Sequence, residues 1–242
     1  MASTSWLRKR SSVGAGTKAG GPNYLLGLGS WQPESGPSSS SLHLRGLEPR
    51  VQDLIESGQS SMDYPAFDLV RRSALSDAIA VATEYHQAKD VSGLGVERNI
   101  FRYRPVPMAI RLSEGSSLPE LLRVLAAATV ARSPFTVSTS AALPRGTQQL
   151  LKAREVEVVV ETDDHWLSRV RGRRITAHRI RLIGGDPSAL AAALGGTPDV
   201  AIYSGAVTPS GRVEVLPFLH EQAVSITNHR FGNPTAFSEG VI

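Results

Sequence analysis

Residues 108–138 read MAIRLSEGSSLPELLRVLAAATVARSPFTVS, and this stretch decides the fold. The apolar run 108–112 predicts a buried strand. Ser117 and Glu120 have the spacing of a capping box, and Pro119 stands at the start of the helix that they predict, which continues to about residue 131. Residues 135–138 predict a second strand. A strand, a helix and a strand in this order form a right-handed βαβ unit with parallel strands.

The same alternation continues along the chain. Asp186 precedes Pro187 as the expected N-cap of a further helix, which ends at Gly195. Strands are expected at 155–160, 179–183, 200–203 and 213–218, helices at 147–154 and 187–194, and one helical turn at 166–170. We therefore predict the α/β fold class, with a Rossmann-like and mainly parallel sheet.

The part before this domain has a different composition. Residues 27–49 are rich in Gly, Ser and Pro, as flexible linkers are. Residues 50–104 carry helical periodicity, with one helix before Gly58 and a longer helix expected over 66–89. The predicted organisation is thus residues 1–26, a linker at 27–49, a helical connecting segment at 50–104, and a Rossmann-like domain with a terminal flap segment at 105–242. Residues 1–49 are expected to be flexible and residues 105–218 protected.

Composition excludes several kinds of chemistry. The chain has 242 residues and no cysteine, which rules out disulfides, Cys-ligated zinc, iron–sulfur clusters and a thiol nucleophile from this chain. No apolar run reaches the roughly 20 residues of a transmembrane helix, and the basic start lacks the apolar region of a secretory signal. We expect a cytoplasmic protein. The formal net charge of +4 is modest, and we expect no nucleic-acid partner.

Four groups of residues are candidate sites, and each has a structural alternative. The turn Gly184-Gly185 precedes a helix and could hold an anion, but Asp186 favours a capped turn. Glu161, Asp163, Asp164 and His165 could bind a metal, or form a charged loop after a strand. His220, Glu221 and His229 miss the HExxH spacing, because Val224 stands in the place of the second histidine. The arginines of 169–174 form a basic cluster without the aromatic residues of a nucleic-acid site. No catalytic, cofactor-binding or metal-binding residue is predicted from these groups.

Three segments resemble a known family. Residues 9–24, KRSSVGAGTKAGGPNY, resemble the last stretch of the catalytic domain of L-glutamate γ-semialdehyde (1-pyrroline-5-carboxylate) dehydrogenases, in which Lys-Ala-Gly-Gly-Pro-x-Tyr is typical. Residues 95–105, GVERNIFRYRP, and residues 220–234, HEQAVSITNHRFGNP, resemble the far C-terminal region of long bifunctional proline-utilisation A flavoenzymes of the actinobacterial kind. The order of the three segments agrees with that region.

The resemblance implies a role in proline catabolism, from proline to glutamate. The family joins an FAD-dependent proline dehydrogenase to an NAD-dependent aldehyde dehydrogenase, whose nucleophile is a cysteine. In long members, a non-catalytic C-terminal domain of aldehyde-dehydrogenase-superfamily fold closes the tunnel between the active sites. This chain would then be a C-terminal fragment that binds no cofactor itself. Its partners would be the remaining dehydrogenase and proline dehydrogenase domains, with an oligomer formed through them.

The resemblance also implies one partial substrate site. The family loop before the position of Lys18 contacts the substrate carboxylate, and Gly14 and Gly16 match it by residue type. Where many members have Ser-Gly-Thr-Gly, this chain has Val13-Gly-Ala-Gly16, so only backbone donors match. The alternative hypothesis is an independent Rossmann-like protein with a nucleotide-binding or regulatory function.

Overall fold

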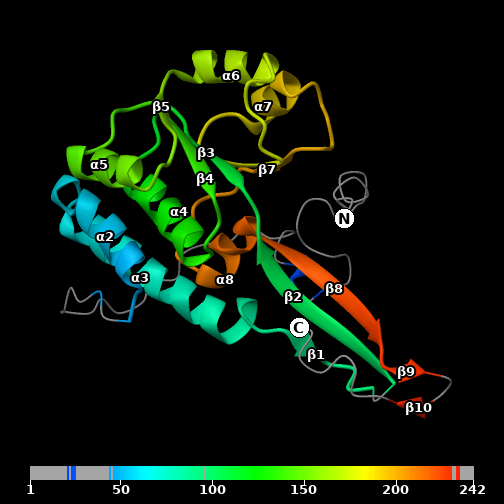
Figure 1. The fold of residues 1–242 in the computed structure, drawn as a ribbon. Helices are drawn as coiled ribbons and strands as arrows, with labels where there is room; N and C mark the ends of the chain where they lie inside the picture. Colours follow the sequence, from blue (N-terminus) through cyan, green and yellow to red (C-terminus); the bar gives the residue numbers. More distant parts are fainter. Residues whose placement is uncertain are drawn as a thin grey trace.

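Figure 1 presents the fold of the protein as a computed structural model. The structure describes residue 21, residues 23–25, residue 44 and residues 46–94, 96–230 and 233–234. Gly14, Gly16 and most of the predicted linker lie outside the described residues.

A five-stranded parallel sheet forms the centre of the larger part. Its strands are β3 (Met108–Leu112), β4 (Phe135–Thr139), β5 (Val158–Val160), β6 (Arg179–Ile183) and β7 (Ala201–Tyr203). The strand order is β5-β4-β3-β6-β7, and each neighbouring pair runs parallel. This is the order of a doubly wound sheet. The predicted α/β class with a Rossmann-like sheet is confirmed.

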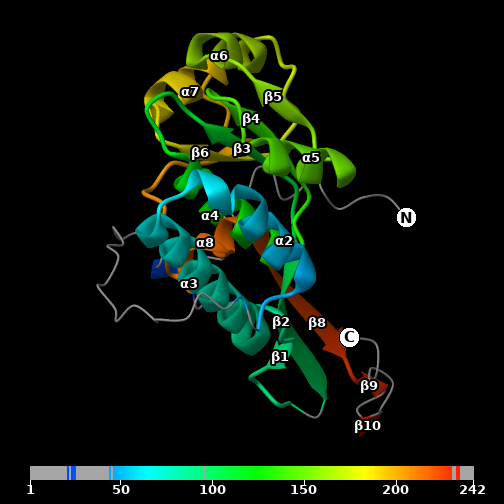
Figure 2. The same cartoon turned by 90° about the vertical axis from the view of Figure 1, so that its left-hand side faces the viewer.

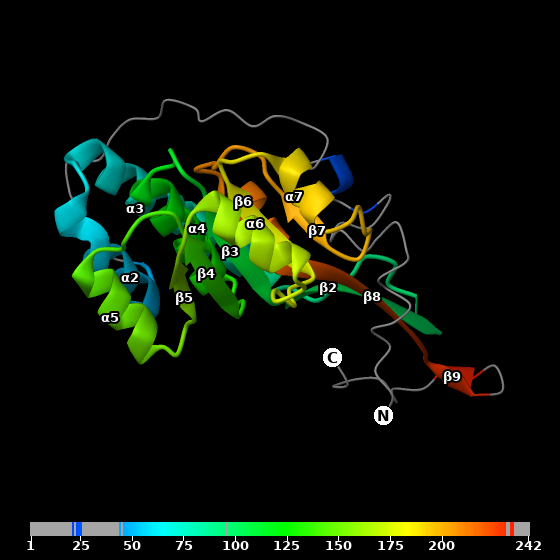
Figure 3. The same cartoon turned by 90° about the horizontal axis from the view of Figure 1, so that it is seen from above.

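Helices cover both faces of this sheet, as Figure 3 shows from above. α4 (Leu118–Val130) and α5 (Arg145–Ala153) lie on one face, and α6 (Asp163–Arg171) and α7 (Pro187–Ala193) on the other. Successive side chains of β3 point to opposite faces of the sheet and belong to two different core clusters. Met108, Ile110 and Leu112 belong to the cluster with α4, while Ala109 packs in the cluster with α6 and α7. The capping box at the start of α4 is present as predicted, and α6 is longer than the expected single turn.

Two further helices form an outer layer over α4 (Figure 2). They are α2 (Pro49–Gly58) and α3 (Tyr64–Ala80), joined by a 3₁₀ turn at Gln59–Ser61. The predicted helix over 66–89 is too long, because a π-helical turn at Val81–Tyr85 follows α3 and a strand begins at Lys89. Among the described residues, none of the helices has both the length and the apolar character that crossing a bilayer requires.

An antiparallel arm projects from the sheet domain (Figures 1 and 2). β2 (Glu97–Pro105) and β8 (Leu219–Thr227) pair along nine residues each, from Glu97↔Thr227 to Pro105↔Leu219. Nine residues extend for about 27 Å. The short β1 (Lys89–Asp90) pairs with β2, and the hairpin of β9 (His229–Arg230) and β10 (Asn233–Pro234) lies at the far end. The arm was not predicted from the sequence.

The predicted strand over 213–218 is wrong. Residues Gly211–Glu214 form a helical turn, α8, and Leu216–Phe218 form a 3₁₀ turn that leads into β8. Buried polar groups decide this conformation, because Glu214 is only 2% exposed and bonds to Arg181 rather than facing solvent from a strand. The predicted strand at 155–160 is also shorter than expected, because Glu155 has a positive φ of 58°.

Buried ion pairs fix the segment that leads to β8. Asp77 of α3 receives two hydrogen bonds from Arg123 of α4, at 2.6 and 2.8 Å. Glu214 of α8 pairs with Arg181 of β6 at 2.7 Å. Thr208 joins the two pairs, since its carbonyl accepts from Arg123 and its amide donates to Glu214, each at 2.9 Å. Four elements of structure therefore meet in one network of buried charges.

Gly211 allows α8 to approach α3, and this position gives a test of the packing. A Cβ atom there would collide with the backbone of Ser76 and Asp77, whereas nothing lies within 4 Å of a Cβ atom at Gly205. We expect Gly211→Ala to lower the free energy of unfolding by about 1–3 kcal/mol, because a backbone shift must relieve the overlap. Gly205→Ala should change it by less than about 0.5 kcal/mol. Urea denaturation measures both, and equal effects would contradict the packing.

Candidate functional site

The carboxyl edge of the parallel sheet is the usual position of a ligand site in α/β proteins. In open α/β sheets, ligands bind where the strand order reverses. Here the chain runs outward from β3 to β4 and β5, and returns to β6 on the other side of β3. The loops at 113–117 and 184–186 follow these two central strands and flank the reversal.

The two loops pack directly against each other. Gly184 and Gly185 have φ values of 68° and 72°, in the left-handed region that favours glycine. A Cβ atom on Gly184 would collide with Ser116 Oγ, and one on Gly185 would lie 2.5 Å from Ser113 Oγ. The Ser116 hydroxyl donates to the carbonyl of Ile183 at 3.1 Å. The two loops are therefore in direct contact at the reversal of strand order, the position where α/β folds commonly bind a phosphate.

Asp186 also takes the position that an anion would need. Its carboxylate accepts a hydrogen bond from the backbone amide of Ser188 at 2.8 Å, which makes it the N-cap of α7 as predicted. The negative charge and the occupied amide both disfavour phosphate at this helix start. The turn at Gly184 and Gly185 is therefore a capped βα turn.

A buried arginine, Arg111, spans the carboxyl edge of the sheet from β3 toward β5. Arg111 of β3 is fully buried, and its guanidinium bonds to Asp163 Oδ1 at 2.7 Å and to Ser138 Oγ at 2.7 Å. It also donates to the carbonyl of Glu161 at 3.1 Å and lies 5.3 Å from the centre of the Trp166 ring. One side chain therefore ties the carboxyl ends of three strands to α6.

Two of the acidic residues that were candidate metal ligands, Glu161 and Asp163, bond to arginines instead, and Asp164 is exposed in the first turn of α6. Burial works against the charged form of Asp163, but hydrogen bonds from Arg111 and from the Glu114 amide outweigh it and lower the pKa of the carboxyl. Glu161 bonds to Arg169 at 2.7 Å and to Ser138 at 2.8 Å. His165 lies 3.0 Å from Glu161, and no metal-binding group of three His, Asp or Glu is found in the described parts of the chain.

The remaining candidates are separated in space or exposed. His220 and Glu221 are neighbours on β8, whose alternation turns them to opposite faces, and His229 begins β9. In the basic cluster, Arg169 pairs with Glu161, whereas Arg171, Arg173 and Arg174 are exposed at the end of α6. A cation at this end balances the helix dipole, which is a structural role.

A second constellation lies at the base of the arm and was missed from the sequence. Asn23 is fully buried, and its amide nitrogen lies 2.5 Å from the hydroxyl of Tyr103 on β2 and 3.1 Å from Glu221 on β8. These three residues come from the three segments that carry the family resemblance. The structure therefore brings together parts of the sequence that are up to 198 residues apart.

Aromatic rings support this junction from the side of α3. The ring centres of Tyr85 and Tyr103 are 4.8 Å apart in an edge-to-face arrangement, and those of Phe101 and Tyr103 are 5.3 Å apart. The Tyr85 hydroxyl donates to the carbonyl of Arg212. Burial raises the pKa of both Tyr85 and Tyr103. The π-helical turn that ends at Tyr85 places this ring, as such turns often do at functional sites.

A local signal for the arm exists in the sequence. Phe101 and Tyr103 alternate with Arg102 and Arg104, which is the period of a half-buried strand. The partner strand lies more than 100 residues away, so neither segment reveals the other. Gly14 and Gly16, the expected substrate contacts, lie outside the described residues, and their role stays a prediction.

Comparison with known proteins gives a structural match but no family model. No protein-family model matches the sequence, and no curated protein matches it. Among solved structures, the chain is similar to proline utilization A (PutA) from Corynebacterium freiburgense, with a TM-score of 0.59 and 31% identity. The match covers 91% of this chain and 18% of that one. The fold is PutA-like. This chain thus spans less than a fifth of the length of that PutA.

Two weaker likenesses accompany this match. Histidinol dehydrogenase from Elizabethkingia anophelis has a TM-score of 0.41 at 14% identity, over 64% of this chain and 38% of that one. PutA from Bdellovibrio bacteriovorus has a TM-score of 0.37 at 15% identity, over 66% of this chain and 20% of that one.

The junction at the base of the arm predicts a specific loss of stability. Asn23→Ala leaves the buried Tyr103 hydroxyl and the Glu221 carboxylate without this donor, so we expect the free energy of unfolding to fall by about 1–3 kcal/mol. Leu25→Ala is the control, because Leu25 is 74% exposed and its truncation should have little effect. Thermal unfolding measures both variants. An Asn23→Ala protein as stable as the control would contradict the junction.

The crowded carboxyl edge predicts that the protein does not bind NAD. Isothermal titration should give no saturable heat with NAD, because Ser113, Ser116 and Asp186 fill the phosphate position. A dinucleotide-binding dehydrogenase serves as the positive control in the same buffer. A dissociation constant in the low micromolar range, lost in a folded Gly185→Val variant, would contradict this prediction.

Proposed function

We propose that this chain is the accessory, non-catalytic C-terminal part of a proline-catabolic oxidoreductase of the PutA kind. In this role it closes the tunnel through which glutamate γ-semialdehyde passes between two active sites. The remaining proline dehydrogenase and aldehyde dehydrogenase domains are its partners, through which it would also join an oligomer, and the setting is cytoplasmic. The PutA-like fold supports this proposal.

The junction at Asn23 is the observation that carries the proposal. The segment around Asn23 resembles the end of a dehydrogenase domain, and Tyr103 and Glu221 hold it at the base of the arm. In a longer enzyme, this contact would set the dehydrogenase domain beside β2 and β8. The arm then extends along that domain rather than into solvent.

The arm has the properties of an element that needs a neighbour. Within the described residues, β1 adds only two residues to the pair of β2 and β8, and a ribbon of two strands is marginally stable in water on its own. The outer half of β8 carries the exposed residues Ala223, Ser225 and Thr227. At its tip, Val91 is 89% exposed, and Leu94 and Val96 are also exposed. We assign these three apolar side chains, the arm tip, to contact with the dehydrogenase domain that Asn23 anchors.

The chemistry of the parent reaction belongs to other domains in this proposal. A cysteine-free chain supplies no thiolate for the attack on the aldehyde. NAD and FAD would be bound by the partner domains, because the carboxyl edge of this sheet is filled. The alternative, an independent nucleotide-binding or regulatory protein, would require that edge to be open, and the NAD titration separates the two.

Two assays of NADH formation test the accessory role. Purified chain with NAD and glutamate semialdehyde should give no NADH above the buffer control. A truncated PutA that lacks the matching region should release its intermediate into solution, so NADH from proline should appear after a lag. Adding this chain should shorten that lag and leave the rate with added semialdehyde unchanged, because only the transfer of the intermediate depends on closure.

The arm tip provides the matched variants for the same assay. Val91→Asp with Leu94→Asp should abolish the effect on the lag, because charged side chains cannot enter an apolar contact. Leu69→Asp is the control, since Leu69 is an exposed apolar residue on α3, away from the arm. Turnover by the chain alone, or a lag that the folded wild-type chain does not change, would contradict the proposed function.

A further inference from the structure

One buried arginine carries a charge that no carboxylate balances. Within the described residues, the side chains of the buried arginines are at most 5% exposed. Four of these arginines form an ion pair at 2.6–2.7 Å, and the pairs are Arg71 with Asp68, Arg111 with Asp163, Arg123 with Asp77, and Arg181 with Glu214. Arg179 is also buried, but it forms no ion pair with any described residue. A buried charge is rarely left without an opposite charge, because its desolvation is then uncompensated.

The contacts of Arg179 are with neutral groups. The residue begins β6, at the amino edge of the sheet, and its Nη1 donates to the carbonyls of Pro217 and Leu219 at 2.7 and 2.6 Å. The guanidinium carbon lies 6.0 Å from the centre of the Tyr203 ring on β7. Burial lowers the pKa of Arg179, and the Tyr203 phenol acts in the opposite direction. Carbonyls and a neutral ring orient the guanidinium but leave its positive charge unbalanced.

The unused donors of Arg179 are the pair that suits a carboxylate. Nε–H and one N–H of Nη2 lie parallel along one side of a guanidinium, and this fork matches the two oxygens of a carboxylate. Neither nitrogen forms a hydrogen bond within the described part of the chain. Neither is sealed from solvent, because the buried polar atoms that lack a partner in these residues lie elsewhere. An incoming anion can therefore reach two parallel donors.

The nearest acidic side chain on this face of the sheet is already engaged. Arg181 lies two residues further along β6, so its side chain leaves the same face as that of Arg179. Oε1 of Glu214 accepts from Arg181 at 2.7 Å, and Oε2 accepts from the amide of Thr208 at 2.9 Å. Glu214 thus balances Arg181, and an anion at Arg179 would meet a net positive charge.

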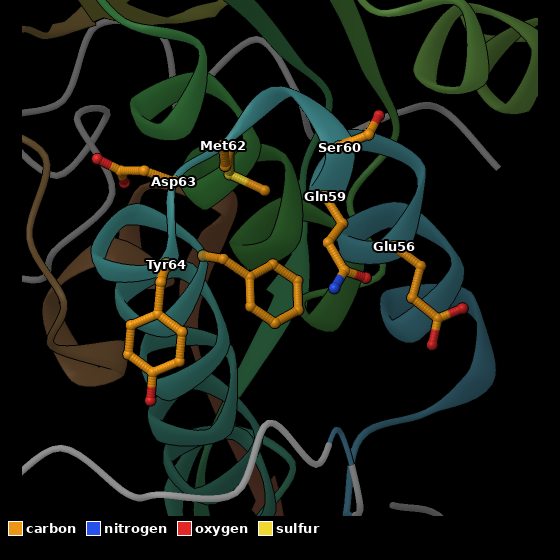
Figure 4. Close-up of a pocket in the computed structure, with 7 residues that line it drawn as sticks. Glu56, Gln59, Ser60, Met62, Asp63 and Tyr64 are labelled. Carbon is orange, nitrogen blue, oxygen red and sulfur yellow. The ribbon is translucent and has the colours of Figure 1, made fainter.

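The pocket between α2 and the start of α3 lacks such a feature (Figure 4). Its two charged side chains, Glu56 and Asp63, point away from each other. Asp63 already accepts from the amide of Ala66 at 2.9 Å as the N-cap of α3. The fold leaves no unbalanced buried charge there, whereas it leaves one at Arg179.

We propose that the open side of Arg179 binds the carboxylate of a small organic acid. Each of the two donors serves one carboxylate oxygen, whereas a tetrahedral phosphate has more oxygens than this fork can bind. Arg179 is only 5% exposed, which limits the ligand to a small group at this position. The site shares no residue with the arm tip or with the junction at Asn23, so it does not depend on the accessory function.

The Nε–H signal of Arg179 gives a direct measure of binding. The full chain, labelled for two-dimensional NMR, is titrated with sodium acetate, and the signal is assigned by its absence in Arg179→Lys. We expect a saturable shift with a dissociation constant on the order of 1–10 mM, which is within the limit for so small a ligand. Acetamide has nearly the same shape without the charge and should give no saturable shift, and neither should sodium chloride at the same ionic strength. Sodium phosphate should bind more weakly than acetate.

Two conservative variants separate the fork from the charge. Arg179→Lys keeps the positive charge but has no parallel donors, so acetate binding, followed by the amide shifts of Tyr203 and Leu219, should weaken at least about fivefold. Arg171→Lys, at an exposed arginine of α6, should bind as the wild type does. If Arg179→Lys does not fold, the comparison of acetate with acetamide on the wild type still decides. The proposal would be overturned by no saturable shift with acetate, by equal shifts with acetamide or chloride, by tighter binding of phosphate, or by unchanged binding in folded Arg179→Lys.

Discussion

Buried ion pairs between α3, α4, β6 and α8 are the constraint on which the position of the arm depends. Burial raises the pKa of Asp77 to about 6, although Arg123 lowers it. The cost of desolvating this carboxylate therefore exceeds its favourable interaction with Arg123. Such a network determines where the four elements lie more than it adds to the free energy of unfolding. Removal of one partner would leave an uncompensated charge, at a cost of about 3–5 kcal/mol. Since α8 leads into β8 through the 3₁₀ turn at Leu216–Phe218, the same charges that hold Glu214 also determine where the second strand of the arm begins.

The carboxyl edge of the sheet shows how a chain's own side chains can pack where α/β folds usually bind ligands. The strand order leaves the usual opening between β3 and β6, but Ser113 and Ser116 meet the glycine turn there. Arg111 then joins the ends of β3, β4 and β5 from within. Each of these contacts rigidifies the edge from which ligand-binding loops usually extend.

Local signals explain which parts of the fold were predictable. The capping box at Ser117 and the N-cap at Asp186 fix helix starts with residues a few positions away, so the βα units could be predicted from the sequence. The strand pairing of 97–105 with 219–227 depends on residues more than 100 positions apart, and no local pattern contains it. The misassigned segment 213–218 has the apolar content of a strand, but the buried bond of Glu214 to Arg181 outweighs that preference. Asn23 could not be identified as a contact, because its partners lie on those unpredicted strands.

The helix α3 connects the outer helix layer to the base of the arm. It begins at Tyr64, and after 17 residues it passes into the π-helical turn that places Tyr85 against Tyr103. A straight helix of this length spans about 26 Å. Along this helix, Asp77 and Ser76 hold it to α4 and α8. The base of the arm is thereby joined to the sheet domain through the same helix that carries the buried ion pairs.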